Sequence, residues 1–201
     1  MKKNIKYLLL FLSLFIIYSC SEDDNPVNFG DATLNTQEAD AALQYLNAVR
    51  ANPSAYSSSI GVDLSSVSAR PALLQNSILT KVAQERAADM AVRDYVGHVN
   101  PDGKACNILI YEAGYTIPSA WYSDPELNYF ESLAANSISI TGQDFINMLI
   151  VDEGVPSLGH RNHLLGIGDF NSTLVDVGIG YATNPKSTYI NYFVVIIAKH
   201  E

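Results

Sequence analysis

Two apolar segments near the C-terminus limit the folds that this chain can adopt. In residues 175–182, large side chains alternate with the small residues Gly178, Gly180 and Ala182. Such alternation is typical of a strand, and the small residues predict a helix packed closely against one face. Residues 189–199 are almost entirely apolar, which predicts a strand covered on both faces. A turn that contains proline separates the two segments, so we predict an antiparallel hairpin.

Helical patterns lie along the chain before this hairpin. Asn35 followed three residues later by Glu38 is a helix-start signal, and apolar residues then recur at helical spacing. Arg50 lies at the end of this first helix. Its side chain could form a salt bridge, but we expect it to be exposed to solvent. The same spacing predicts further helices at 77–95, 104–113, 131–136 and 143–151, with a short strand at 126–130. Together the elements predict an α+β chain folded as a three-layer α-β-α sandwich around a small antiparallel sheet.

The first 20 residues have the features of an export signal. Lys2, Lys3 and Lys6 precede an apolar run at 7–18 that is too short to span a bilayer. The run ends beside Cys20, in a context that resembles a bacterial lipobox. We therefore predict a lipoprotein signal peptide at 1–19, lipidation of Cys20, a flexible acidic tether at 20–35 and one domain at 36–201. The alternative is a plain secretory signal with an incidental cysteine.

The charge and cysteine content restrict the partners. The chain has 12 Lys and Arg against 21 Asp and Glu, a net charge of −9. This balance argues against nucleic acid and against electrostatic docking on anionic lipid, so attachment to a bilayer would come through acylated Cys20. We expect a place in the cell envelope, on an outer membrane, facing either the periplasm or the surface. Only Cys106 then remains, which we expect to be a buried small hydrophobic residue.

Two histidines and a carboxylate stand at the ends of predicted elements. His98 precedes the turn sequence Asn-Pro-Asp-Gly, and His160 lies in the sequence Gly-His-Arg. Glu131 begins an apolar segment between them. Imidazole and carboxylate groups are what a metal site or a proton-transfer site needs, so His98, Glu131 and His160 are the candidate catalytic residues.

These segments, in this order, resemble the CAP superfamily of cysteine-rich secretory, antigen 5 and pathogenesis-related proteins, in its bacterial lipoprotein branch. The resemblance covers residue 37 to the C-terminus and rests on matching motifs at 47–50, 98–103, 131, 159–161 and 164–165. It implies the CAP fold and one cleft formed by His98, Glu131, Asp152 and His160. Glu153 is an alternative to Asp152, because residues 153–156 are an insertion. Unlike plant and animal members, this chain has no cysteine pair for an internal disulfide once Cys20 is lipidated.

Such a tetrad could bind a divalent metal such as zinc, or it could be a hydrogen-bonded structural cluster. His163 follows His160 by three residues and is an additional candidate ligand. The sequence has no His-Glu-x-x-His motif, no Gly-x-Ser-x-Gly motif, and no Ser or Cys adjacent to a histidine. CAP domains are associated with lipid binding, signalling and disputed proteolysis. We therefore expect a binding module for a metal, lipid or peptide; the alternatives are a metal-dependent hydrolase or peptidase and a purely structural surface protein.

Overall fold

The computed structural model describes residues 28–124 and 127–199. The predicted signal peptide, Cys20 and the first part of the tether lie outside these residues, as does Glu126. The tether prediction is wrong from residue 28 onward, because β1 (Asn28–Phe29) and β2 (Ala32–Leu34) belong to the sheet. Ala32 and Leu34 are buried, and β2 pairs with the strand that contains Ala182. Burial of these two side chains explains why the segment is ordered.

The predicted C-terminal hairpin forms the centre of the sheet. β5 (Asp176–Thr183) and β6 (Asn191–Ala198) pair antiparallel along their whole length. The strand order is β1-β2-β5-β6-β4, and β3 (Leu74–Gln75) pairs parallel with β5. The remaining strand pairs of the described sheet are antiparallel.

The outer strand β4 (Glu131–Asn136) corrects a prediction. The sequence pattern indicated a helix at 131–136 and a strand just before it; the helix position is a strand, and residues 127–130 are not. β4 pairs with β6 from Glu131 opposite Ile196 to Asn136 opposite Asn191. Pairing with an apolar strand overrides the local helix preference of this segment, which no local pattern could reveal.

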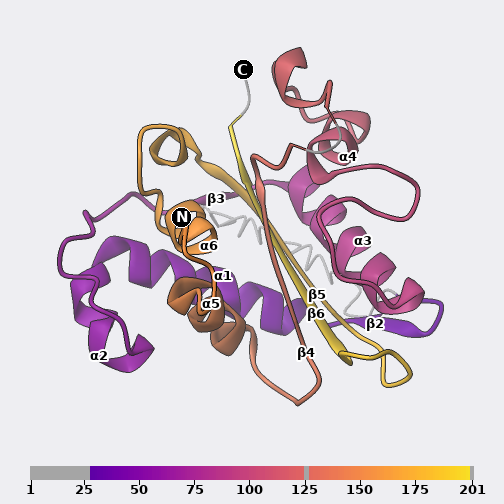
Figure 1. Cartoon of the computed structure of the whole chain (residues 1–201), viewed down its shortest axis with the longest axis horizontal. Helices are drawn as coiled ribbons and strands as arrows, with labels where there is room; N and C mark the ends of the chain where they lie inside the picture. The colour runs from indigo at the N-terminus through magenta and orange to yellow at the C-terminus, as the bar shows by residue number, and fades with distance from the viewer. Residues whose placement is uncertain (1–27, 125–126, 200–201) are drawn as a thin grey trace, which may run out of the picture.

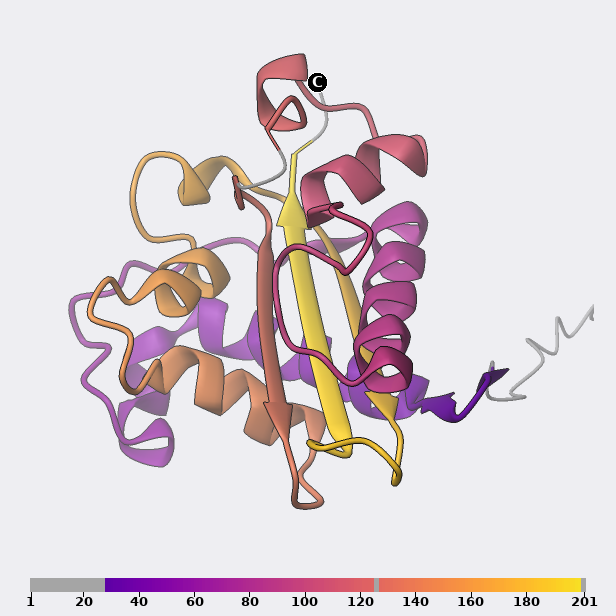
Figure 2. The same cartoon turned by 45° about the vertical axis from the view of Figure 1, so that its right-hand side comes forward.

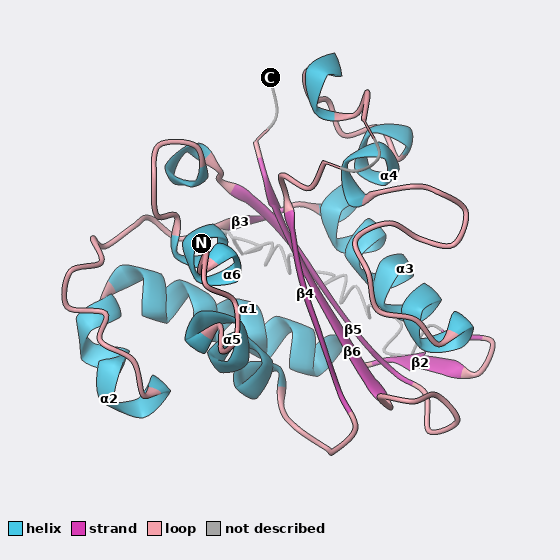
Figure 3. Cartoon of the chain, in the orientation of Figure 1, coloured by secondary structure: helices cyan, strands magenta, loops and turns pink. Residues whose placement is uncertain are grey.

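Helices cover both faces of the sheet, which confirms the predicted three-layer sandwich (Figure 1). One face carries α3 (Ser77–Arg93) and α4 (Cys106–Glu112). The opposite layer holds α1 (Thr36–Ala51), α5 (Gly142–Val151) and α6 (Gly159–Leu165). Figure 3 also shows the short helical segments in the connecting loops, which are η1 (Pro53–Tyr56), α2 (Ser57–Ile60), η2 (Ser119–Trp121) and η3 (Asn171–Thr173). Among the described residues, none of the helices has the length and apolar character needed to cross a bilayer.

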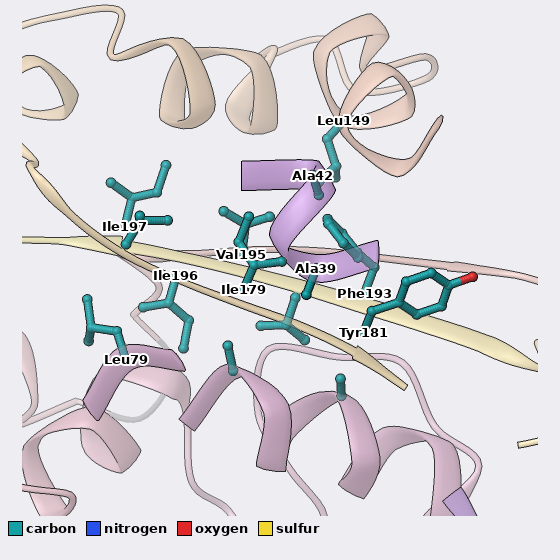
Figure 4. Close-up of a cluster of buried hydrophobic side chains, with 14 of the residues drawn as sticks. Ala39, Ala42, Leu79, Leu149, Ile179, Tyr181, Phe193, Val195, Ile196 and Ile197 are labelled. Atoms are coloured by element: carbon teal, nitrogen blue, oxygen red, sulfur yellow. The ribbon is translucent and has the colours of Figure 1, made fainter. Parts of the chain in front are cut away.

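The core confirms that β6 is covered on both faces. Figure 4 shows Val195 and Ile197 on one side of the sheet, and Ile196 on the other side with Leu79 of α3. All three β6 side chains are fully buried. Alternate residues of one strand thus contribute to both apolar layers.

The small residues of β5 do allow a close helix, as predicted. A Cβ atom built on Gly180 would lie 2.1 Å from the Ala83 carbonyl oxygen of α3, and one on Gly178 would lie 2.1 Å from the Leu79 carbonyl carbon. No real Cβ approaches so closely, so the backbones of β5 and α3 touch only because these positions lack side chains.

Arg50 was expected to be solvated, and this expectation is wrong. Its side chain is buried at the end of α1, where Nη1 donates to the Leu164 carbonyl at 2.7 Å and Nε to the Pro71 carbonyl at 3.4 Å. Desolvation lowers the pKa of Arg50 to about 10. The residue joins α1 to the C-terminal end of α6.

Candidate functional site

His98 is positioned by the loop that follows α3. The helix ends at Asp94, whose backbone is left-handed with a φ of 53°. The predicted turn forms at Asn100, whose carbonyl accepts from the Gly103 amide at 2.9 Å and whose Oδ1 accepts from the Lys104 amide at 2.8 Å. The loop brings Nδ1 of His98 to 2.8 Å from Oε2 of Glu131.

A buried arginine fixes Glu131. Nε of Arg86 donates to Oε1 of Glu131 at 2.9 Å and Nη2 donates to Oε2 at 3.2 Å, so the pair is bidentate. The same Nη2 donates to the carbonyls of Gly97 and His98 at 2.7 and 3.2 Å. Burial lowers the pKa of Arg86, but the carboxylate of Glu131 outweighs this effect and the net shift is upward. Arg86 therefore holds both the carboxylate and the loop that carries His98.

Arg86 is a site residue that sequence reasoning missed. The sequence pattern predicts only that Arg86 belongs to the helix at 77–95. On that helix it shares a face with the apolar residues Val82, Ala83 and Met90, all of which are buried. An arginine among core positions is a signal of a buried partner, because arginine is rarely buried unless it is paired.

His160 has its own carboxylate on the other side of the sheet. Nδ1 of His160 lies 2.7 Å from Oδ1 of Asp152, and Oδ2 accepts from the amides of His160 and Arg161 at 3.0 and 3.2 Å. Asp152 follows α5 in a left-handed conformation, and from there its carboxylate accepts from two backbone amides in the first turn of α6. Glu153 is exposed, so Asp152 is the acid that partners His160.

One cleft of about 340 Å³ joins the two histidines. Its lining includes His98, Glu131, His160, Ser132 and Asn128. Asp152 lies behind His160 and lines an adjoining groove instead. The structure thus places three of the four predicted site residues around the same cleft, with the fourth hydrogen-bonded to one of them.

The carboxylates determine which nitrogen of each histidine carries the proton. An ionised carboxylate can only accept a hydrogen bond, so Nδ1 of His98 and of His160 must be the donor. A neutral imidazole protonated at Nδ1 has its lone pair at Nε2. The side-chain amide nitrogen of Asn128 lies 3.2 Å from Nδ1 and 3.4 Å from Nε2 of His98 and donates to the Glu131 carbonyl, so the assignment rests on the carboxylates and not on Asn128.

A metal site with all four residues as direct ligands does not fit this geometry. Every carboxylate oxygen of Glu131 and Asp152 already accepts at least one N–H hydrogen bond. Within residues 28–124 and 127–199, no group of three or more His, Cys, Asp or Glu side chains could hold a metal ion. Of the four predicted residues, only the two histidines keep an atom that does not pair with a carboxylate, and that atom is Nε2.

His163 has a different role from His98 and His160. Ser132 lies beside it, with Oγ 2.8 Å from Nδ1, and Nε2 lies 3.3 Å from the Ile197 carbonyl. A carbonyl only accepts, so Nε2 carries the proton and Nδ1 accepts from the hydroxyl. Desolvation lowers the pKa of His163 to about 4. Both nitrogens are used, which leaves none for a metal.

The Ser132–His163 pair also corrects the statement that no serine stands beside a histidine, which holds in the sequence but not in space. Ser132 is only 1% exposed and His163 only 6%. Both residues line the cleft, but burial and their mutual hydrogen bond leave the hydroxyl poorly exposed for attack, and the pair joins β4 to α6 as a structural link.

Comparison with known proteins identifies the fold. No protein-family model matches the sequence, and no curated protein matches it either. Among solved structures, an outer surface protein from Borrelia burgdorferi superposes with a TM-score of 0.52 at 17% identity, over 88% of this chain and 100% of that chain. An extracellular protein containing an SCP domain from Bacillus anthracis gives a TM-score of 0.49 at 17% identity, over 82% of this chain and 42% of that one.

The chain has an SCP/CAP-like fold. The resemblance that the motifs indicated is thereby confirmed at the level of the fold. At such low identity the likeness concerns the SCP/CAP-like arrangement of helices and sheet and does not extend to the role of the cleft.

Proposed function

We propose that this chain is an extracellular, membrane-anchored binding module whose cleft holds a ligand between the imidazoles of His98 and His160. The observation that carries the proposal is the pairing of each Nδ1 with a buried carboxylate. This pairing directs the lone pair of each Nε2 away from its partner. The two histidine side chains are 39% and 27% exposed, so a ligand from solvent can reach them.

A divalent metal ion such as zinc is the ligand class that we put first. Imidazoles that bind metals commonly donate their other N–H to a carboxylate, which fixes the ring and increases its basicity. Glu131 and Asp152 would have this orienting role and would not coordinate the ion. Two imidazoles leave coordination positions for water or for a group of a second ligand, such as a lipid or peptide.

We also propose that the module is attached to the outer membrane through acyl chains on Cys20. The basic and apolar segments before Cys20 support an export signal, and the acidic residues that follow would separate the domain from the lipid surface. The Borrelia protein of the same fold is an outer surface protein, which supports the same location for this chain. Intact-mass analysis of the membrane fraction, beside Cys20→Ala, tests the anchor; an unlipidated wild-type protein would contradict it.

The binding proposal is tested by calorimetric titration of the metal-free chain with zinc. We expect near-stoichiometric uptake that is lost in His98→Ala and in His160→Ala, and retained in the matched histidine control His200→Ala. Equal uptake by the His98→Ala/His160→Ala double variant would overturn the proposal. A hydrolase would in addition show turnover that chelation abolishes, whereas we expect binding without turnover.

The same variants test the structural alternative. If the cluster serves only the fold, His160→Ala will lower the free energy of unfolding and zinc will have no effect on the wild type. We expect zinc to raise the melting temperature of the wild type and not that of His160→Ala, because a ligand that binds the native state stabilises it.

A further inference from the structure

The free edge of β4 has the features of a binding site for an added strand. β4 is the last strand of the sheet on its side (Figure 2). The Phe130 carbonyl accepts from the Ile197 amide of β6, and hydrogen-bonding positions alternate along an antiparallel pair. The backbone groups of Ser132 and Ala134 therefore point toward β6. Those of Glu131, Leu133 and Ala135 point toward the open edge.

At Glu131 the side chain of Asn128 already binds the backbone groups of the open edge. Oδ1 of Asn128 accepts from the Glu131 amide at 3.0 Å, and Nδ2 of Asn128 donates to the Glu131 carbonyl at 2.9 Å. One side-chain amide thus makes the two bonds that a neighbouring strand would make. The corresponding groups of Leu133 and Ala135 have no hydrogen-bond partner in the described part of the chain.

An apolar groove of about 620 Å³ runs beside these unpaired groups. Its apolar lining comes from β4, from α5 and from the loop after α5, namely Leu133, Ala134, Met148, Leu149, Val151 and Val155. His160 and Val155 also line the histidine cleft, so the groove continues into that cleft. The charged residues of the groove are Asp152 and Glu153, with no Lys or Arg among the described residues that line it.

We propose that β4 binds an extended, basic and apolar peptide segment by strand addition, with apolar side chains in this groove. Backbone pairing at Leu133 and Ala135 would supply affinity, and the groove would select alternate side chains. The exposed Glu153 favours a Lys or Arg on the peptide, and the acidic chain as a whole favours a cationic partner.

Two other occupants fit these observations less well. The chain's own residues 20–27 are acidic, and they lead into β1 at the opposite edge of the sheet. A second copy of the chain would bring a second Glu153 to the same acidic groove. The proposal does not depend on metal binding by His98 and His160, and its test uses no metal.

The experiment is selection of peptides from a displayed random dodecamer library, in parallel on the wild-type chain and on Ala135→Pro. Proline at this position removes an edge-facing N–H, which edge strands tolerate. Glu153→Lys removes the acidic charge, and Glu85→Lys on α3 is the matched control. Circular dichroism and thermal unfolding check that each variant is folded.

We expect the wild type and Glu85→Lys to enrich peptides in which apolar residues alternate and Lys or Arg recurs. Binding of these peptides should weaken about tenfold or more in Ala135→Pro and in Glu153→Lys, since each lost interaction is of the order of a hydrogen bond. The selected peptide, resynthesised with N-methyl groups at alternate residues, should lose binding in one register and keep it in the other.

Three results would overturn the proposal. One is the absence of enrichment on the folded wild-type chain. Another is enriched peptides that bind equally well after N-methylation in either register, a test that remains valid if Ala135→Pro does not fold. The third is a concentration-dependent dimer of the wild type that Ala135→Pro abolishes, which would assign the edge to a second copy.

Discussion

Glu131 and Ser132 are adjacent on β4 and hold histidines in opposite layers of the sandwich. Glu131 accepts from His98, in the loop after α3, and Ser132 donates to His163 of α6. Successive strand residues point to opposite faces, so this edge strand can serve both layers. The cleft therefore straddles the edge of the sheet, with His98 on one side and His160 on the other.

Loss of Arg86 should strongly destabilise the chain. Arg86→Met leaves the carboxylate of Glu131 buried without its cation, and breaking such a pair costs about 3 to 5 kcal/mol. Urea unfolding measures the change. The double variant Arg86→Met/Glu131→Gln removes the unpaired charge and should recover much of the loss. A single variant within about 1 kcal/mol of the wild type would contradict the geometry.

The depressed pKa of His163 predicts that acid weakens the fold. The unfolded chain takes up a proton near the ordinary histidine pKa of 6.5, whereas the folded chain resists until about 4. This contribution to stability is present above pH 6.5 and is lost as the pH falls toward 4, by up to about 3 kcal/mol.

Unfolding of the wild type and His163→Gln at pH 7 and pH 4.5 isolates this contribution. The other groups that influence the pKa of His163 are present in both proteins. Its ring is hydrogen-bonded to Ser132 and the Ile197 carbonyl, and the nearby titratable groups are His160, Arg50 and Glu131. The wild type should lose about 2 to 3 kcal/mol more than the variant between the two pH values. Equal losses would show that His163 is not buried in the neutral form.

Parts of this site were predictable because they depend on neighbours in the sequence. The turn at Asn100 and the α6 start at Gly159 place His98 and His160 at element ends, and each is encoded within a few residues. Gly178 and Gly180 likewise indicated a close helix. The turn and the helix start follow from local backbone preferences, whereas the glycines indicate a close neighbour because they lack a Cβ.

Other parts depend on partners far away in the chain and could not be predicted. Residues 131–136 have a helical composition, and they are a strand only because β6 offers a buried edge. Arg86 and Glu131 are 45 residues apart, so nothing local shows that one would hold the other. The sequence could not decide between Asp152 and Glu153 as the partner of His160. The choice depends on where α5 ends, because the left-handed turn at that point directs Asp152 toward α6.

A methyl group at Gly180 should separate β5 from α3. Gly180→Ala places a Cβ 2.1 Å from the Ala83 carbonyl oxygen, so the backbones must move apart, and we expect a loss of about 3 kcal/mol or more. Gly97→Ala is the matched control, because its Cβ would meet only the Val99 carbonyl oxygen at an ordinary 3.6 Å. Equal unfolding midpoints for the two variants would refute the close packing.

Cys106 should be unreactive in the native chain. Its side chain is buried, and desolvation raises the pKa of the thiol well above its usual value. In a Cys20→Ser chain at pH 8, a thiol reagent should label Cys106 only after urea is added. Rapid labelling without urea would show that the site opens and would conflict with the packing of α4.

The most direct test of the cleft is a long-range proton–nitrogen correlation spectrum of the chain with ¹⁵N-labelled histidine, recorded at pH 8 with and without zinc. Single alanine variants assign the signals. We predict that His98 and His160 carry their proton on Nδ1 and that zinc shifts their Nε2 signals, while His163 keeps its proton on Nε2 and does not respond. Protons on Nε2 of His98 and His160, or zinc shifts confined to His200, would contradict the account.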